Sequence, residues 1–132
     1  CHSLPALIRR VIERQNPIEV WGDGEQARDL VFAADVADAC LRAISLISGW
    51  DVFNLSYGQT YTINELLKKF IEIDRFKGAR IVHLPKSLAT SSSRTFSNKK
   101  LQDVLGYRPT TSIDDGLAAT IRWYRENRQL AA

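Results

Sequence analysis

The chain has 132 residues, of which 45% are hydrophobic and 25% are charged, and these values predict one soluble globular domain spanning residues 1–132. They exclude a disordered, collagen-like or disulfide-built protein. Eighteen Lys and Arg against fifteen Asp and Glu leave a net charge of +3. Because the basic residues are interspersed, we expect neither nucleic acid nor a membrane surface as the partner, and anionic small ligands stay open.

The chain has too few cysteines for a disulfide framework and too few cysteines and histidines for a metal site. Cys1 and Cys40 lie far apart, and only His2 and His83 are available as imidazole ligands, so we expect no disulfide framework and no metal. No apolar run approaches membrane-spanning length, and the first residues lack the profile of a signal peptide. We therefore expect a cytoplasmic protein. The chain contains no Met, so we expect it to be processed or part of a longer protein.

The first predicted element is a helix that begins at Ser3 and ends before Asn16-Pro17. Its apolar residues recur at helical spacing: Leu4, Leu7, Ile8, Val11 and Ile12. Short strands are then expected at residues 18–21 and 29–33, separated by the turn Gly22-Asp23-Gly24.

The second predicted helix begins at Asp35, which we expect to cap it, and ends before Gly49. Its apolar stripe places Cys40 in the core, together with Val36, Ala39, Ala43, Ile44 and Ile47. A strand is expected at residues 52–55, closed by Tyr57-Gly58.

The rest of the chain alternates helices with one strand and a long loop. Thr62 and Glu65 have the spacing of a capping box and predict a third helix. A strand at residues 80–84, a loop at 86–97, a short helix at 98–105 ended by Gly106, and a last helix at 113–127 follow. The predicted class is α/β, with several helices and too few strands for a complete doubly wound sheet.

Residues 22–27 read Gly-Asp-Gly-Glu-Gln-Ala and fit the dinucleotide-binding pattern Gly-x-Gly-x-x-Ala. That fingerprint needs a helix immediately after it, because the helix amides bind the pyrophosphate. A strand is expected here instead. We therefore predict a tight turn and no cofactor site.

Trp21 and Arg28 flank this turn and allow two interpretations. An aromatic face and a guanidinium could stack on a base and bind a phosphate, or they could be a buried Trp and a surface Arg. Arg9, Arg10 and Arg14 are typical of a solvated helix face.

Arg94 in a serine-rich loop is either a free charge or an anion ligand. His2 could transfer protons, although a terminal His often has no role, and His83 in a strand is more typical of a structural residue. The chain shows no Ser-His-Asp order and no Tyr-x-x-x-Lys, so the residues alone indicate no complete active site.

Several segments in fixed order resemble one family, the extended short-chain dehydrogenase/reductases of the NAD-dependent epimerase/dehydratase type, which act on nucleotide sugars. The resemblance covers nearly the whole chain. It is carried by His2 to Arg10, Val20 to Gly24, Arg28-Asp29, Asp35 to Ala39, Phe53 to Leu55, Thr62 to Leu66, Leu105 to Pro109, Ser112 to Leu117 and Trp123-Tyr124.

These segments are similar to the C-terminal, substrate-binding part of that family. The family's glycine-rich NAD(P) motif and its Tyr-x-x-x-Lys pair belong to an N-terminal Rossmann half, which the chain lacks. By resemblance, His2 would lie by the nicotinamide and transfer protons, and Arg10 would bind substrate. Trp21 and Arg28 would contact the nucleotide and diphosphate, and Arg94 would close over the diphosphate.

The sequence also departs from the family pattern. The usual pair of Asp residues is Ala34-Asp35, the usual Gly-rich turn is Ser56-Tyr57-Gly58, and the Asp expected after the basic loop residue is Ser97. The sugar is therefore not readable from the sequence. The opening residues and Trp21 are most similar to the family's NADPH-dependent epimerase-reductases.

The resemblance implies the GDP- or UDP-sugar-binding half of an epimerase, dehydratase or reductase. NAD(P) would be bound mainly by the missing half, so we expect no cofactor and no catalysis from this chain alone. The family tends to form homodimers. The alternative is a free-standing binding module derived from such an enzyme, and a small basic nucleic-acid binder is least favoured.

Overall fold

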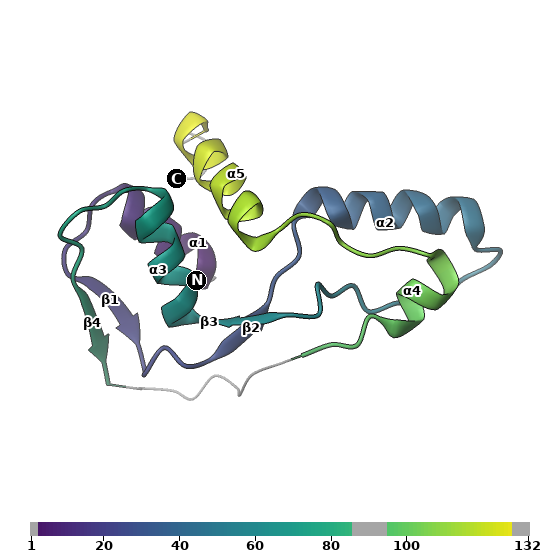
Figure 1. The fold of residues 1–132 in the computed structure, drawn as a ribbon, viewed down its shortest axis with the longest axis horizontal. Helices are drawn as coiled ribbons and strands as arrows, with labels where there is room; N and C mark the ends of the chain where they lie inside the picture. Colours follow the sequence, from purple (N-terminus) through teal and green to yellow (C-terminus); the bar gives the residue numbers. More distant parts are fainter. Residues whose placement is uncertain (1–2, 86–94, 128–132) are drawn as a thin grey trace. The chain divides into compact units, whose positions relative to one another are not determined.

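The computed structural model describes residues 3–85 and 95–127, and within these ranges it contains five helices and four short strands (Figure 1). In chain order they are α1 (Ser3–Ile12), β1 (Ile18–Trp21), β2 (Ala27–Asp29), α2 (Ala33–Leu46), β3 (Thr60–Thr62), α3 (Ile63–Ile73), β4 (Ile81–Leu84), α4 (Lys99–Leu105) and α5 (Ile113–Glu126). This confirms the predicted mixed α/β class with few short strands. Along the described part of the chain, no helix is long and apolar enough to cross a membrane.

The chain divides into two compact units. Unit 1 comprises Cys1–Gln26, Thr62–Ser92 and Asp114–Ala132, and unit 2 comprises Ala27–Tyr61 and Ser93–Ile113. The chain therefore passes from unit 1 to unit 2 and back twice, so each unit is assembled from segments that are distant in sequence.

The core of unit 1 is formed by residues of three helices, α1, α3 and α5, and of a parallel strand pair. β1 pairs with β4 in the register Ile18 with Ile81 through Trp21 with Leu84. Alternate residues of β1 point to one face, so Ile18 and Val20 are both buried. The apolar faces of the helices complete this core with Leu7, Ile8, Val11, Leu66, Leu67, Phe70, Leu117 and Ile121.

The capping box predicted for the third helix is confirmed. The Glu65 amide donates to Thr62 Oγ1 at 3.1 Å, and the Thr62 amide donates to Glu65 Oε2 at 2.7 Å. Two amides at the start of α3 are thereby satisfied, which fixes its first turn. The prediction that Gly106 ends the short helix is confirmed as well, because Gly106 directly follows α4 and has φ +58°.

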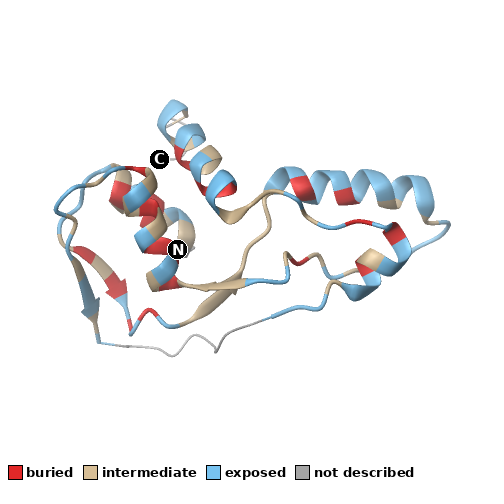
Figure 2. Ribbon diagram, in the orientation of Figure 1, coloured by how far each residue is buried: buried red, intermediate tan, exposed pale blue. Residues whose placement is uncertain are grey.

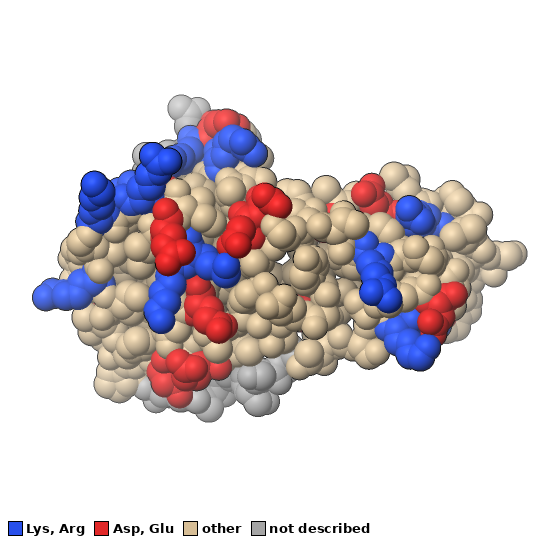
Figure 3. Space-filling view, viewed as in Figure 1, with Lys and Arg blue, Asp and Glu red and all other residues tan. Residues whose placement is uncertain are grey.

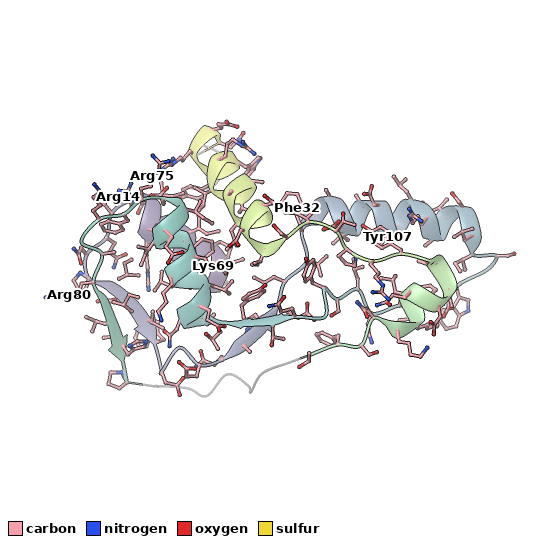
Figure 4. All side chains as sticks on the ribbon, in the orientation of Figure 1. Arg14, Phe32, Lys69, Arg75, Arg80 and Tyr107 are labelled. Atoms are coloured by element: carbon pink, nitrogen blue, oxygen red, sulfur yellow. The ribbon has the colours of Figure 1, made fainter. Side chains whose placement is uncertain are left out.

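Unit 2 has a small core between α2 and α4, made of Ala39, Leu101, Leu105 and Tyr107. Ala43, Ile47, Phe53 and Leu55 pack against it. Figure 4 shows Tyr107 between these two helices. β2 and β3 form a second two-stranded sheet.

Two predictions at the start of α2 are wrong. The strand expected at residues 29–33 lies at Ala27–Asp29, and the helix already begins at Ala33. Asp35 does not cap the helix, because Phe32 occupies the N-cap position without a side-chain cap bond. Asp35 is instead buried in the first turn and accepts hydrogen bonds from residues far along the chain.

Two further predictions fail because they depend on long-range contacts. Cys40 is exposed, since only part of the α2 stripe packs on the core of unit 2. Residues 52–55 form no strand, because no described segment pairs with them. Figure 2 shows that α2 is exposed over most of its length.

Candidate functional site

Trp21 ends β1, at the carboxyl end of the parallel pair. The Gly22 amide donates to the Leu84 carbonyl at 2.9 Å, which ties this end of β1 to the end of β4. Trp21 is 59% exposed although it is a large aromatic residue. Ligands of open α/β sheets bind outside the carboxyl ends of the strands, so the indole offers a stacking surface in a suitable place. The interpretation as a buried Trp is wrong.

The turn after Trp21 is held by Asn64, in the first turn of α3. The Asn64 amide donates to the Gly24 carbonyl at 3.1 Å. Its side-chain Nδ2 donates to the Asp23 carbonyl at 2.9 Å and to Glu25 Oε1 at 2.6 Å. The predicted tight turn is confirmed, because β2 rather than a helix follows it. The described residues therefore do not fit a dinucleotide at Gly-x-Gly-x-x-Ala, which lacks the helix amides for a pyrophosphate.

His83 of β4 supports the same turn. Its Nε2 lies 2.9 Å from Asn64 Oδ1, and since a carbonyl oxygen only accepts, His83 donates this bond. Asn64 thus joins β4, α3 and the turn that follows Trp21. Asn64 was missed as a positioning residue, because nothing local to its sequence shows that it contacts residues about 40 positions earlier.

Gly24→Ala should lower the free energy of unfolding by about 2 to 3 kcal/mol. Gly24 has φ +75°, and an added Cβ would lie 2.2 Å from Asn64 Oδ1. Gly78→Ala is the matched control, because Gly78 has φ +77° and no atom within 4 Å of its added Cβ. The control should cost only about 1 kcal/mol of backbone strain. Urea unfolding of both variants measures the difference. Equal losses of unfolding free energy would show that the Asn64 side chain can move away from the added Cβ at no cost.

Arg28 lies on β2, next to a residue that fixes the strand. Asp29 Oδ1 accepts the Tyr57 amide at 3.1 Å, and Asp29 Oδ2 accepts the hydroxyl of the buried Ser56. Successive strand residues point to opposite faces, so Arg28 points away from this cluster. It is half-buried and donates to the Ala27 carbonyl at 2.8 Å. Among the described residues no carboxylate pairs with Arg28. Within the described ranges, the Arg28 guanidinium therefore has further donors available to an anion.

Arg10 connects α1 to β1, since its Nη1 donates to the Glu19 carbonyl. Arg10 also lines a pocket of about 610 Å³ in unit 1, between α1 and α5. The residues that line this pocket also include Arg9 and the aromatic residues Trp123 and Tyr124. A pocket with guanidinium and aromatic groups suits an anion that carries a planar group.

Arg9 of α1 and Arg14, which lies two residues after the end of α1, differ from each other. Arg9 is exposed and pairs with Glu13 at 3.0 Å, as expected of a solvated helix face. Arg14 contradicts that expectation, because it forms an ion pair with the buried carboxylate of Asp74. Figure 4 shows Arg14 at the end of α1.

The structure describes three of the five residues proposed from the sequence. Trp21 and Arg10 lie in unit 1, and Arg28 lies in unit 2. His2 and Arg94 lie outside the described residues. Figure 3 shows several basic side chains next to one another at the upper left of the face it displays, with acidic side chains beside them, and basic and acidic side chains interspersed elsewhere.

The chain is similar to proteins of one family. The family described as "NAD dependent epimerase/dehydratase family" matches residues 1–56. A putative GDP-L-fucose synthase 2 of Arabidopsis thaliana is 35% identical over 130 residues, which are 96% of this chain and 39% of that protein. This agrees with the resemblance to epimerase-reductases.

Solved structures of the family share this fold. UDP-glucose 4-epimerase of Thermotoga maritima, solved with UDP-glucose, is 28% identical, with a TM-score of 0.79 over 93% of this chain and 38% of the epimerase. The enzyme WbmF of Bordetella bronchiseptica, solved with NADH, is also 28% identical, with a TM-score of 0.83 over 98% of this chain and 38% of WbmF. The chain thus spans about two fifths of these relatives. It belongs to the extended short-chain dehydrogenase/reductases of the NAD dependent epimerase/dehydratase family, and it corresponds to their C-terminal part.

Proposed function

We propose that residues 1–132 bind the nucleotide diphosphate of a GDP- or UDP-sugar for an NAD(P)-dependent epimerase, dehydratase or reductase of the GDP-L-fucose synthase type. One observation carries this proposal most directly. Arg28 is half-buried on a strand that Asp29 fixes, and no carboxylate of the described residues pairs with it. A guanidinium in that setting suits a diphosphate, since it offers several donors and a charge that water screens only partly.

Each of the other residues proposed from the sequence has a role of its own. Trp21 offers a stacking face for the base, and its exposure at the end of β1 supports that role. Arg10 binds substrate, and its place in the pocket of unit 1 supports this. Arg94 closes over the diphosphate, and His2 lies by the nicotinamide and transfers protons during epimerisation. These last two roles rest on the resemblance alone.

NAD(P) would be held mainly by a Rossmann half outside this chain, because the described glycine turn leads into a strand. When bound, the cofactor supplies hydride transfer. Without that half, the chain is inactive. As part of the whole enzyme, it works in the cytoplasm and forms homodimers. The second candidate is a free-standing binding module without catalysis, which the same nucleotide contacts would also support.

Arg28→Ala should cost about 1.5 to 3 kcal/mol of binding free energy for GDP or UDP, the range for hydrogen bonds to charged groups. Arg80→Ala is the matched control, because Arg80 is exposed and lies neither in the pocket of unit 1 nor on the strand of Arg28. It should cost well under about 1 kcal/mol. Calorimetric titration of the chain and both variants measures these losses. Equal losses would indicate non-specific charge attraction, and the diphosphate site at Arg28 would be wrong.

A further inference from the structure

We infer that Ser56 is a positioning residue for Arg28. The inference rests on the proposed function, in which Arg28 binds the diphosphate of a nucleotide sugar. Ser56 belongs to the turn at residues 56–58 of unit 2, where the sequence departs from the glycine-rich turn of the family pattern. Its side chain reaches Asp29, the residue that directly follows Arg28 on β2.

The Ser56 hydroxyl is fully buried, and both its donor and its acceptor function are used. It donates to Asp29 Oδ2 and accepts the Gly58 amide at 2.9 Å. A serine hydroxyl carries one proton, so the bond to Asp29 uses its only donor. Because a buried hydroxyl that loses its partner costs free energy, burial keeps this bond formed and keeps the Asp29 carboxylate in place.

The Asp29 carboxylate is bound by the turn through both of its oxygens. Oδ2 accepts the Ser56 hydroxyl, and Oδ1 accepts the Tyr57 amide at 3.1 Å. Two bonds from adjacent residues restrict rotation of the Asp29 side chain. They also attach the end of β2 to the turn, so the backbone on which Arg28 lies is held at one end.

Asp29 is the acidic residue nearest to Arg28 in the sequence, and a guanidinium binds a free carboxylate readily. Among the described residues the two form no ion pair. Neighbouring strand residues point to opposite faces, and the turn already binds both carboxylate oxygens. Ser56 therefore fixes the strand of Arg28 and also keeps the adjacent carboxylate away from the guanidinium.

The turn is itself held from its other side by the start of α4. Asn98, at the N-cap position of α4, donates from Nδ2 to the Ser56 carbonyl at 3.0 Å. Asn98 Oδ1 in turn accepts from Gln102 Nε2 at 2.5 Å. Ser56 thus connects β2 to α4 through its hydroxyl and its carbonyl. A binding group supported in this way is already in place before the ligand arrives, and this raises affinity.

The test is calorimetric titration with GDP of Ser56→Ala, made both in the unmodified chain and in the Arg28→Ala variant. In the unmodified chain, Ser56→Ala should weaken GDP binding about 5- to 10-fold, because the guanidinium loses its fixed position. In the Arg28→Ala variant, the same change should alter the affinity by less than about 2-fold, since no guanidinium remains to be positioned.

Two further variants serve as controls. Ser45→Ala is the matched control, because Ser45 is an exposed serine of α2 in the same unit, whose hydroxyl donates to the Leu41 carbonyl at 3.1 Å. It should leave the GDP affinity unchanged. Ser56→Cys keeps a group of similar shape with a weak S–H donor, so its loss should lie between those of the unmodified chain and Ser56→Ala. If Ser56→Ala does not fold, as judged by circular dichroism, Ser56→Cys replaces it in both backgrounds.

Three results would overturn the inference. The first is a loss below about 2-fold on Ser56→Ala while Arg28→Ala still weakens GDP binding, which would leave the nucleotide site and remove only the positioning role. The second is an equal loss on Ser56→Ala in both backgrounds, which would mean that the hydroxyl supports the fold alone. The third is an unchanged affinity of Arg28→Ala, which would overturn the proposed function as well. The two failures are therefore distinguishable.

Discussion

Replacing Asp74 by Asn should lower the free energy of unfolding by about 2 to 4 kcal/mol, less than a fully buried ion pair would give. Asp74 is buried and follows α3, where its two carboxylate oxygens accept from Arg14, two residues after the end of α1, and from Arg125 of α5. Arg14 Nη2 also donates to the Asp74 carbonyl at 3.0 Å. One side chain thus connects three helices of unit 1. Because both guanidinium groups are about half exposed, water will recover part of the loss.

Asn keeps the shape of Asp74 and removes only its charge and one acceptor. Asp103→Asn is the matched control, because Asp103 pairs with Lys99 on the exposed surface of α4. The control should cost at most about 0.5 kcal/mol. Urea unfolding monitored by tryptophan fluorescence measures both variants. A loss below about 1 kcal/mol at Asp74 would mean that the three helices hold together through apolar packing alone.

The sequence predicted those elements whose signals are local. The capping box at Thr62 and Glu65 and the glycine after Leu105 each act within one turn of a helix, so a few neighbouring residues determine them. The tight turn at Gly24 was also predicted, because the expected strand after it is close in sequence.

The errors occur where distant segments decide the outcome. Cys40 follows a correct helical periodicity, yet the core of unit 2 is too small to cover the whole stripe. Residues 52–55 have strand-like residues, but a strand also needs a neighbour. Arg14 was placed on a solvated face because its partner Asp74 lies 60 residues later.

In the candidate site, too, some features were predictable from the sequence and others were not. The residue types at Trp21 and Arg28 suggested stacking and phosphate binding, and the structure adds that Trp21 is exposed and that Arg28 has no carboxylate partner among the described residues. The support behind them was not predictable. Asn64 holds the turn after Trp21, and Asp29 anchors the strand of Arg28 through Ser56 and Tyr57.

Asp35→Asn should destabilise unit 2 by about 2 to 4 kcal/mol at pH 7. Asp35 Oδ1 accepts the Thr110 amide at 3.0 Å and the Tyr107 hydroxyl at 3.3 Å, and Oδ2 accepts the Thr111 amide at 3.2 Å. An Asn side chain has one acceptor oxygen, so its NH₂ group would face a backbone or hydroxyl donor. The residues after α4 would then lose their attachment to α2.

The same carboxylate makes stability depend on pH. Burial opposes ionisation of Asp35, but hydrogen bonds from Thr110, Thr111 and Tyr107 outweigh it and hold the pKa of this carboxyl below its ordinary value. A pKa that is lower in the folded than in the unfolded state stabilises the fold above the unfolded pKa of about 3.9. This stabilisation is lost as the pH falls from about 4 through the lowered folded pKa, because the protonated carboxyl no longer favours the folded state.

Urea unfolding between pH 7 and pH 2.5 tests this assignment. The difference in unfolding free energy between the unmodified chain and Asp35→Asn should stay constant down to about pH 5 and then shrink as Asp35 becomes protonated. Asp103→Asn is the control, because Asp103 is an exposed carboxylate of unit 2 that pairs with Lys99, and its difference should be small throughout. A difference at Asp35 that does not change below pH 4 would show that its charge is not what holds residues 107–111 to α2.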